Sequence, residues 1–443
     1  MARGTPARGP ERPPTPPGLP VIGNTVGFAT DSFGFIEEAV ATTGDVVRIR
    51  LLGRDVYGLA HPDHVETALL DRETFAKLEG FEVAFGESVL ATEGEQWHRQ
   101  RHAMEDFFTP RRIGEHAETM TRVATERADR WAAGTTIDAD EAMRGVALEN
   151  LFEVILGQSL TPAEIDDLAA AASALNLYFK PTSWALPEWV PTPARRRFDR
   201  RSGDLRDAAR RLLADEGPDP DPDSLLARLS TLRDDPDSAF DASEVLDQVV
   251  GMLFAGHETT ALSMTYALHA IGSNPAVADR FYDELDETLG ERLDGTPTPS
   301  DLDELPYLER IVDETLRWVP PVHTIPRVTT EPVEVGGYEI PADAEVLCSV
   351  WNVHRDSRFY DEPERFDPDR WADTTPRERG YAYVPFGAGP RICIGRHFAR
   401  LEMKATLATL GRRFAFDAVG DLAFDPQMTT QPDGPVRIRL RER

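Results

Sequence analysis

The 443-residue chain contains only two cysteines, Cys348 and Cys393. Two cysteines provide no disulfide framework, which is consistent with a reducing cytoplasm. Lysine is also scarce, since Lys77, Lys180 and Lys404 are the only three. The sequence has no apolar run long enough to cross a bilayer, and no glycine-rich flavin or nucleotide fingerprint. It therefore predicts neither a membrane anchor nor a fused nucleotide-binding domain.

The chain has fewer basic than acidic residues. The chain has 48 Lys and Arg against 77 Asp and Glu, a formal net charge of −29. A negative field of this size repels nucleic acids and anionic membranes, so it excludes nucleic-acid binding. The same imbalance destabilises the compact state unless salt screens it. We therefore expect an acidic surface of the kind that salt-adapted proteins carry, and a stability that depends on salt.

Residues 1–20 contain seven prolines and no apolar run, so we expect them to be disordered. Residues 21–443 are expected to form a single domain. Apolar residues from Val46 to Ala60 predict a short strand pair, and residues 328–350 predict further strands around Gly336 and Gly337. Most other segments show helical periodicity. The expected fold is mainly α with a small β-rich lobe.

The ten residues from Phe386 to Gly395 carry the second cysteine. Three glycines in this stretch allow positive φ angles and a backbone that lies flat against a large planar group. The pattern becomes helical after Gly395, so Cys393 lies beside a helix N-terminus, whose amide dipoles favour a thiolate. A lone cysteine more often fills space in a core, and we interpret Cys348 in that way.

The order Phe-x-x-Gly-x-Arg-x-Cys-x-Gly resembles the haem-binding signature of the cytochrome P450 monooxygenases. Its fixed positions are met by Phe386, Gly389, Arg391, Cys393 and Gly395. The resemblance implies a cytochrome P450 fold in which Cys393 is the axial thiolate ligand of the iron in haem b. A thiolate ligand pushes electron density toward bound dioxygen and favours cleavage of the O–O bond. Together with the acidic composition, the resemblance suggests a prokaryotic enzyme from a halophilic archaeon.

A second motif lies within a long predicted helix. Asp241 and Glu244 form a capping start, and the apolar pattern continues past Ile271. Its middle reads Ala-Gly-His-Glu-Thr-Thr at 255–260, and polar residues there are costly to bury unless they are used. The run is similar to the oxygen-activating motif of the same family.

That resemblance implies roles for three residues. The Thr259 hydroxyl would donate toward the bound oxygen, Glu258 would relay protons from solvent, and Gly256 would belong to the part of the helix over the haem. A threonine in the middle of a helix more often donates to the preceding turn. Both interpretations of Thr259 stay open at this point.

The resemblance also implies residues that bind the haem and the substrate. Trp97 and Arg101, on a helix that we expect to begin with a capping box at Thr92, match the family's propionate-binding Trp-x-x-x-Arg. The implied propionate donors are Trp97, Arg101, Arg327 and Arg391, while His98 and His323 are undecided. The implied substrate pocket consists of Phe81, Phe85, Phe179, Ala255, Val322, Thr324 and Ile325. Ordinary loop and helix-corner packing would explain its phenylalanines equally well.

Glu314 and Arg317 form an i,i+3 pair that is weak when exposed. In the resembling family such a pair joins the arginine of a Pro-Glu-Arg-Phe run, here Arg365, in a buried structural lock. We therefore assign these three residues to stability and not to catalysis.

The resemblance implies a monooxygenase that inserts one oxygen atom from O2 into an apolar substrate by hydroxylation or epoxidation. Electrons would come from a separate ferredoxin or flavodoxin with its reductase. A basic stripe at Arg396, Arg400 and Lys404 is either a solvated face or the docking site for this donor. The alternatives are a peroxygenase driven by hydrogen peroxide, a non-catalytic haem-thiolate sensor, and a hydrolase using Cys393 with His397 as base. Fatty acid, terpenoid, steroid and polyketide substrates are equally compatible.

Overall fold

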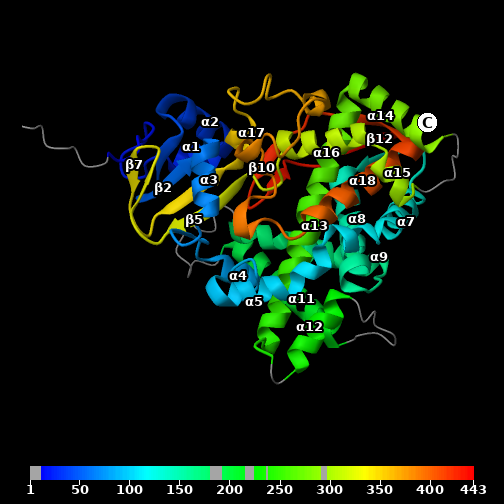
Figure 1. Cartoon of the computed structure of the whole chain (residues 1–443), viewed down its shortest axis with the longest axis horizontal. Helices are drawn as coiled ribbons and strands as arrows, with labels where there is room; N and C mark the ends of the chain where they lie inside the picture. Colours follow the sequence, from blue (N-terminus) through cyan, green and yellow to red (C-terminus); the bar gives the residue numbers. More distant parts are fainter. Residues whose placement is uncertain (1–10, 180–191, 215–223, 236–237, 291–296) are drawn as a thin grey trace, which may run out of the picture. The chain divides into compact units, whose positions relative to one another are not determined.

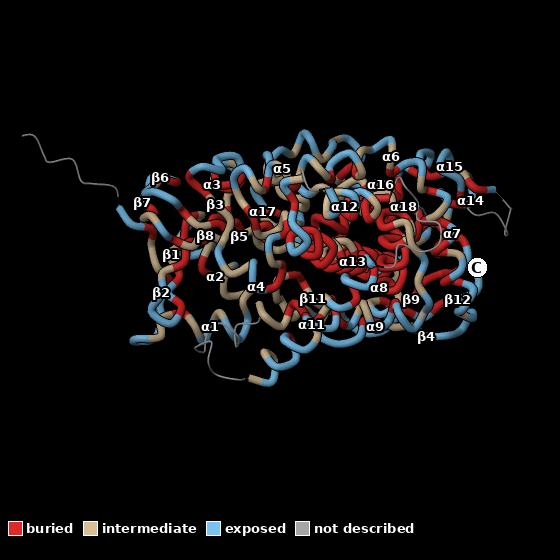
Figure 2. The backbone as a smooth tube through the Cα atoms, turned by 90° about the horizontal axis from the view of Figure 1, so that it is seen from below, coloured by how far each residue is buried: buried red, intermediate tan, exposed pale blue. Residues whose placement is uncertain are grey.

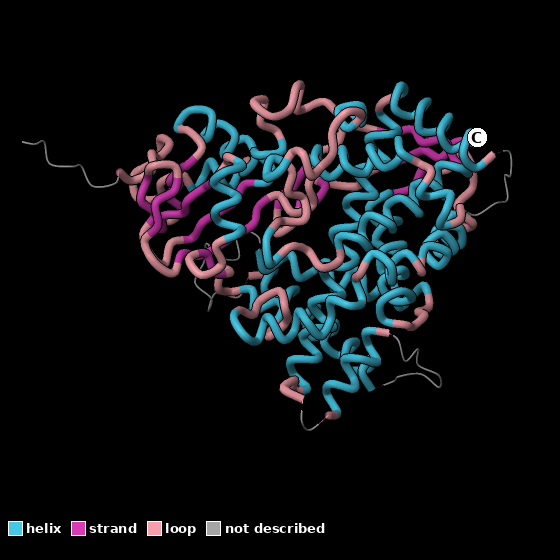
Figure 3. Tube along the Cα trace, in the orientation of Figure 1, coloured by secondary structure: helices cyan, strands magenta, loops and turns pink. Residues whose placement is uncertain are grey.

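A computed structural model describes residues 11–179, 192–214, 224–235, 238–290 and 297–443. The chain groups into two compact units, built from segments that are far apart in the sequence. The first unit combines residues up to 79 with 323–363 and 377–392, and the second contains 80–322, 364–376 and 393–443. Strands gather in the first unit while the second is largely helical (Figure 3), which confirms the mainly α fold with a small β-rich part.

The first unit contains a five-stranded sheet, a two-stranded hairpin and short helices. Its elements are α1 (Thr25–Thr30), α2 (Ser32–Thr43), β1 (Val46–Leu51), β2 (Arg54–Leu59), α3 (Pro62–Leu70), β3 (Phe75–Ala76), β5 (Thr324–Thr329), β6 (Val333–Val335), β7 (Tyr338–Ile340), β8 (Glu345–Ser349), α17 (Val350–His354), and the 3-10 turns η5 (Gly380–Ala382) and η6 (Gly389–Arg391).

The sheet order is β1-β2-β8-β5-β3. The expected hairpin is confirmed, since β1 and β2 pair antiparallel from Val46 opposite Leu59 to Leu51 opposite Arg54. The second expected turn is also present, with Gly336 at φ +58° and Gly337 at φ +81° between β6 and β7. Cys348 in β8 is fully buried in the apolar core, and burial raises the pKa of its thiol to about 12. It is the core residue that the sequence predicts.

The N-terminal segment differs from its expectation of disorder. Residues 1–10 lie outside the described ranges. From Glu11 onward the chain contacts the sheet region, because Glu11 pairs with Tyr338 and the Pro14 carbonyl accepts a hydrogen bond of 2.8 Å from the Arg48 amide. Proline fixes φ and lowers the entropy lost on ordering, so a proline-rich strap can pack against a sheet edge.

The second unit contains the long central helix and most of the other helices. Its elements are α4 (Phe81–Phe85), α5 (Gly94–Glu105), η1 (Asp106–Phe108), α6 (Pro110–Gly114), α7 (Ala117–Ala128), β4 (Thr136–Asp138), α8 (Ala139–Asn150), the π-helical η2 (Leu151–Leu156), α9 (Pro162–Ser173), η3 (Ala174–Phe179), α11 (Pro193–Ala214), α12 (Leu225–Asp234), α13 (Ala242–Ser273), α14 (Pro275–Leu289), α15 (Pro299–Asp303), α16 (Pro306–Trp318), η4 (Pro368–Trp371), α18 (Arg396–Arg413), β9 (Phe414–Val419), β10 (Phe424–Pro426), β11 (Thr430–Pro432) and β12 (Arg437–Glu442).

Helix α13 is the element around which the second unit packs (Figure 1). It has 32 residues and begins as predicted, since the Asp241 side chain accepts a hydrogen bond from the Glu244 amide. Helices α8, α11, α16 and α18 all contact it. Figure 2 shows most of its length as buried, in agreement with the exposure of its residues.

Two local expectations were wrong. The segment around Phe81, expected as a loop, contains the short helix α4. Helix α5 has no capping box, because the Thr92 hydroxyl instead donates to the Gln100 side chain at 2.5 Å and to the Ser88 carbonyl at 3.1 Å. In the described part of the chain, no helix combines the length and apolarity needed to cross a membrane.

Candidate haem-thiolate site

The glycine loop before Cys393 has the backbone freedom that the sequence predicts. Gly387 and Gly389 adopt φ angles of +67° and +69°. A Cβ on Gly389 would lie 2.7 Å from the carbonyl oxygen of Leu69, so glycine is required there for two reasons. Gly395 differs, because it has φ −85° and serves as the N-cap of α18.

The Cys393 residue is exposed. Burial by the surrounding chain nevertheless raises the pKa of its thiol, while the Gly395 amide and the cations Arg101 and Arg396 act to lower it. The amide and the two cations supply the environment that stabilises a thiolate. Among the described residues, no group of three or more His, Cys, Asp and Glu side chains is placed to hold a metal ion. A haem iron needs only one such protein ligand, because the porphyrin provides the others.

One face of α13 is open although the rest of the helix is buried. Met252, Ala255, Gly256 and Thr259 are each partly exposed, while their neighbours Phe254, His257, Glu258 and Thr260 are buried. The open residues recur at i, i+3, i+4 and i+7, which places them on one stripe. An apolar stripe with one hydroxyl, left accessible on a central helix, fits a flat cofactor with space for an apolar molecule. The residues present therefore fit a haem.

Gly256 has a packing role as well. A Cβ at this position would lie 2.9 Å from the Leu151 side chain, so the glycine lets α13 pack closely against η2. The Thr259 hydroxyl donates to the Ala255 carbonyl at 3.0 Å. This is the bond to the preceding turn that mid-helix threonines commonly make. Thr259 is the one hydroxyl on the open stripe.

Trp97 and Arg101 both lie on α5, as predicted. Trp97 is buried and Arg101 is half-buried. Burial lowers the pKa of the Arg101 guanidinium, and the Cys393 thiol is the first group that acts against this. This electrostatic influence places Arg101 near the thiol. His98 is exposed and contacts the Trp97 ring at a centroid distance of 4.9 Å.

Several predicted residues belong to the first unit. Arg327, Thr324 and Ile325 lie on β5, where Arg327 is buried and the other two are partly exposed. The Arg391 guanidinium donates to the carbonyls of Phe75 at 2.7 Å and Arg72 at 3.3 Å.

Two other predicted positions flank the loop and the strand. Phe386 in the glycine loop is partly exposed. His323, directly before β5, has its Nδ1 2.9 Å from the Thr324 hydroxyl. Val322 is the last residue of its segment in the second unit and is also partly exposed.

Glu258 lies at the centre of a buried polar network. Its carboxylate pairs with Arg144 and accepts hydrogen bonds from Asn176 at 2.8 Å, Gln431 at 2.5 Å and Ser173 at 3.2 Å. Burial acts to raise the pKa of Glu258, but Arg144, His257 and the hydrogen bonds outweigh it, and the net pKa is lowered. Glu258 is therefore an ionised carboxylate.

The Glu314–Arg317 pair is fully buried, with Nη2 of the arginine 2.8 Å from Oε1 of the glutamate. The Arg370 guanidinium also pairs with Glu314, at 2.9 Å. Trp371 also donates to Glu314 at 3.1 Å. The predicted third member, Arg365, contributes its backbone carbonyl, which accepts from Arg317 and Arg370. Glu314 therefore carries ion pairs with both Arg317 and Arg370.

The predicted pocket phenylalanines form one aromatic cluster in the second unit. The Phe85 ring lies 5.1 Å from Phe254 and 6.1 Å from Phe179, and Phe81 lies 5.3 Å from Phe179. Phe85 and Phe254 are buried, while Phe81 and Phe179 are partly exposed. The cluster brings together α4, η3 and α13. A partly exposed apolar surface on a buried aromatic base is what an apolar ligand requires.

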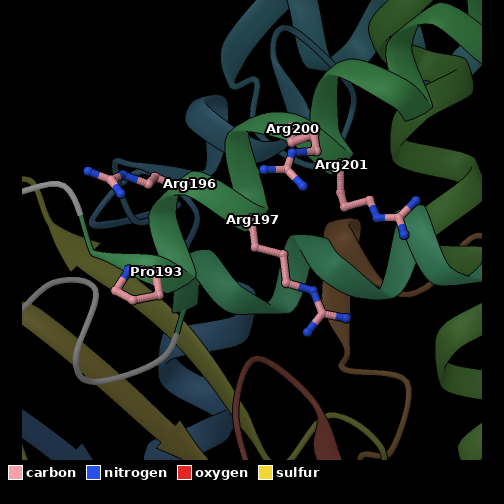
Figure 4. A pocket seen from close by; sticks show the side chains of 5 residues that line it. All are labelled: Pro193, Arg196, Arg197, Arg200 and Arg201. Atoms are coloured by element: carbon pink, nitrogen blue, oxygen red, sulfur yellow. The ribbon is translucent and has the colours of Figure 1, made fainter.

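A separate hollow of about 410 Å³ opens on α11. Figure 4 shows the side chains that line it, which are Pro193, Arg196, Arg197, Arg200 and Arg201. All five belong to one helix, and none is among the residues assigned to the haem or the substrate. Four guanidiniums make this hollow cationic and not apolar, so we do not place the substrate there.

The basic stripe of α18 is largely neutralised. Arg400 pairs with Glu309 and with Asp313 at 2.5 Å, and Lys404 pairs with Glu309 at 2.9 Å. Intramolecular pairing leaves these two cations little attraction for an acidic partner, so the docking interpretation of the stripe loses its basis.

Sequence reasoning missed the partners of Glu258 and the polar face at the start of α13. Arg144, Asn176 and Gln431 lie on α8, η3 and β11, and no local pattern connects them. By contrast, Glu244, Asp247 and Gln248 recur at i, i+3 and i+4 in the first turns of α13, where most neighbouring residues are apolar. This spacing predicts that another segment packs against the polar face at the start of α13.

Comparison with known proteins identifies the family of the chain. The model of the cytochrome P450 family matches residues 13–438. Cyclooctat-9-en-7-ol 5-monooxygenase of Streptomyces melanosporofaciens is 32% identical over 432 residues, covering 93% of this chain and 92% of that protein. Cyclooctatin synthase of the same organism is 30% identical, covering 96% and 94% of the two chains. Pentalenene oxygenase of Streptomyces avermitilis is 30% identical and covers 96% of each.

The family model matches nearly the whole chain, and three relatives at 30–32% identity are covered over more than nine tenths of their length. This chain belongs to the cytochrome P450 family and is a haem-thiolate monooxygenase.

Proposed function

We propose that this monooxygenase hydroxylates an apolar cyclic terpene and that Cys393 Sγ is the axial ligand of its haem b. The observation that carries the site assignment is the open stripe of α13, where three apolar positions and the Thr259 hydroxyl are accessible in a buried helix. The proposed donors to the haem propionates are Trp97, Arg101, Arg327 and Arg391. Phe386, Gly389, Gly395 and Gly256 are proposed to shape the surfaces against which the cofactor lies.

When bound, the haem supplies the electron-transfer and dioxygen-activating chemistry of the reaction. The chain's own contribution begins with Thr259. We assign its Oγ1 the task of giving a hydrogen bond to the oxygen that reacts. To do so the hydroxyl must rotate away from the Ala255 carbonyl, toward the open side of its helix. The Thr259 hydroxyl makes a hydrogen bond in either orientation, so its rotation costs little free energy.

Glu258 is proposed to move protons from solvent toward Thr259. Because its pKa is lowered, the carboxylate must take up a proton before it can give one. Ser173 and Gln431 are its partly exposed hydrogen-bond partners, and they are the proposed contacts with solvent. The buried Arg144 keeps the resting carboxylate charged.

The substrate class follows from the relatives and from the aromatic cluster. Two relatives are named for pentalenene and for cyclooctat-9-en-7-ol. The proposed lining of this chain's pocket is apolar, with Thr324 as its one hydroxyl: Phe81, Phe85, Phe179, Ala255, Val322, Thr324 and Ile325. Such a pocket favours a hydrocarbon or a mono-alcohol over a charged acid, because a buried unpaired carboxylate is costly.

Electrons are proposed to come from a separate ferredoxin or flavodoxin with its reductase, in the cytoplasm. A reconstituted assay with either donor would identify which one supports turnover.

The test of this function uses two variants. Cys393→Ser should lose both the reduced carbon-monoxide absorption typical of thiolate ligation and product formation from terpene substrates. Thr259→Ala should keep that absorption but form less product per reductant consumed. If Cys393→Ser keeps both properties, the ligand assignment is wrong. Turnover that runs on hydrogen peroxide and is unchanged in Thr259→Ala would favour the peroxygenase alternative.

A further inference from the structure

The loop after α4 is held by a buried carboxylate of α13 that the haem chemistry does not use. Asp247 Oδ2 accepts a hydrogen bond of 2.7 Å from the Glu87 amide. Its other oxygen, Oδ1, accepts from Arg206 of α11 at 2.5 Å. The Asp247 side chain is 4% exposed and that of Arg206 is 25% exposed. We call this arrangement of Asp247, the Glu87 amide and Arg206 the Asp247 clasp.

The backbone of the loop is shaped to meet this carboxylate. Gly86 has φ +55°, and a Cβ on it would overlap the Asp247 carboxylate. Next to the clasp, the Gln248 side chain accepts a hydrogen bond of 2.9 Å from the Val89 amide. The Gln100 side chain donates to the Glu87 carbonyl at 2.7 Å. The loop therefore depends on side-chain partners where a regular element would use backbone ones.

The clasp adjoins the aromatic cluster in sequence and in space. Phe85 directly precedes Gly86, and its ring packs on Phe254, which lies seven residues after Asp247 on α13. Residues separated by seven lie on the same face of a helix. Phe179 belongs to η3, against which α11 packs. Two of the three elements that supply the cluster thus meet at Asp247, since α13 carries it and the loop after α4 bonds to it. Helix α11, which packs on the third element η3, reaches Asp247 through Arg206.

We propose that Asp247 is a positioning residue for substrate specificity: its two bonds fix Phe85, and through Phe85 they set the shape of the apolar pocket. This inference rests on the proposed pocket. A carboxylate that is almost fully buried is costly unless hydrogen bonds and an ion pair satisfy its oxygens. Here one oxygen restrains the loop and the other restrains α11. A ligand that needs a wider pocket has to break the clasp, so the clasp favours ligands that fit the closed cluster.

The test compares ligand affinities in haem-loaded protein. Spectral titration with a compact cyclic terpene and with a longer apolar ligand gives a dissociation constant for each variant. Asp247→Ala should weaken binding of the compact ligand about fivefold and reduce the preference for it, because a coupling of this kind is worth a factor of a few. Asp247→Asn keeps an acceptor for the Glu87 amide, so it should recover part of the loss. Arg206→Gln should resemble Asp247→Asn.

A double-mutant cycle with Phe85→Ala separates positioning from a general structural role. If Asp247 acts through Phe85, Asp247→Ala should change affinity less than about twofold in the Phe85→Ala background. Equal effects in both backgrounds would overturn the proposal. Phe85→Ala without any effect on affinity would instead reject the pocket assignment itself.

Amide hydrogen exchange provides a readout that does not depend on the haem. The Glu87 amide should exchange faster in Asp247→Ala and remain protected in Asp247→Asn. The matched control is Arg210→Gln on the same helix, whose partner Asp207 is exposed and 2.5 Å away. This variant should leave both affinity and exchange unchanged. Unchanged Glu87 exchange in Asp247→Ala would contradict the clasp.

Discussion

Replacing Arg144 with methionine tests the buried network around Glu258. The Glu258 side chain is fully buried, and Arg144 is 11% exposed. Without Arg144, the carboxylate would keep neutral hydrogen-bond donors, among them Ser173, Asn176, Thr429 and Gln431. Removing one partner of a buried ion pair costs about 3–5 kcal/mol, because the remaining charge is stranded. We expect Arg144→Met to lower the free energy of unfolding by that amount.

The reciprocal variant Glu258→Gln should cost less, about 1–3 kcal/mol. Arg144 retains a second partner, since its Nε lies 3.0 Å from an oxygen of Asp140, and its remaining exposure gives it access to water. With its NH2 group at the position of Oε1, the new amide would face Asn176 and Gln431, which both donate to that oxygen. These two hydrogen bonds are then lost. We therefore expect Arg144→Met to destabilise the protein more than Glu258→Gln does.

Denaturant and thermal unfolding of the two variants measure this order. The control is Arg210→Gln, which breaks an i,i+3 pair whose side chains are 58% and 64% exposed. Exposed pairs contribute at most about 1 kcal/mol, so this control should unfold like the parent. An Arg144→Met protein as stable as the control would refute the reasoning, because the stranded carboxylate would then have cost nothing.

The same network predicts a pH dependence. Because the pKa of Glu258 is lowered from its ordinary value of 4.5, the unfolded state binds the proton more tightly than the native state. The stabilisation is then fully present above the unfolded pKa and is lost as the pH falls through the folded pKa. The stability gap between the parent and Glu258→Gln should be constant near pH 7 and shrink below 4.5. A gap that widened toward acid pH would contradict this assignment.

Three further outcomes are expected. Gly389→Ala should lower the free energy of unfolding by about 1–3 kcal/mol more than Gly420→Ala does. Both glycines have positive φ, but a Cβ on Gly389 would meet a backbone oxygen, whereas a Cβ on Gly420 would meet open space. Equal losses of stability in chemical denaturation would contradict the close approach at Gly389. Burial raises the pKa of Glu402 well above 4.5, so the parent loses stability as the pH rises above 4.5 and the buried carboxyl group is forced to ionise. The free energy of unfolding of Glu402→Gln should therefore increase relative to that of the parent by up to about 1.4 kcal/mol per pH unit. Finally, the melting temperature should rise from dilute buffer to molar KCl because screening relieves a net charge of −29, and a melting temperature insensitive to salt would reject the salt-adaptation hypothesis.

The parts of this fold that were predictable are those specified by nearby residues. The β1–β2 hairpin and the start of α13 follow from an alternating pattern and an aspartate cap. The predicted capping box at the start of α5 was wrong, since the Thr92 hydroxyl donates to the Gln100 side chain and to the Ser88 carbonyl. Both partners lie within eight residues of Thr92, so the threonine hydroxyl has local alternatives to a capping bond, and the motif alone does not distinguish them.

The candidate site shows the same division. Cys393 and Thr259 could be proposed from the sequence because each lies in a short motif with fixed spacing. The ion pairs that hold these motifs in place could not be found, because their members come from distant segments: Arg144 is 114 residues from Glu258. For the lock, the expectation selected Arg365, whereas the additional ion pair to Glu314 comes from Arg370. A sequence motif therefore predicts contacts between residues that are near one another in the chain, and not contacts between distant segments.

The acids of α13 explain why its open stripe stays open. Asp247 and Glu258 are eleven residues apart, which is about 20° around an α-helix. They therefore lie on one stripe, and each is paired with an arginine from a different helix, α11 or α8. Thr259 lies about 100° further round the helix, on the accessible side. Two ion pairs on one side fix the rotation of α13 about its own axis, and this rotation leaves Ala255, Gly256 and Thr259 accessible. The charges buried in this helix thus orient the hydroxyl to which we assign the proposed catalytic role.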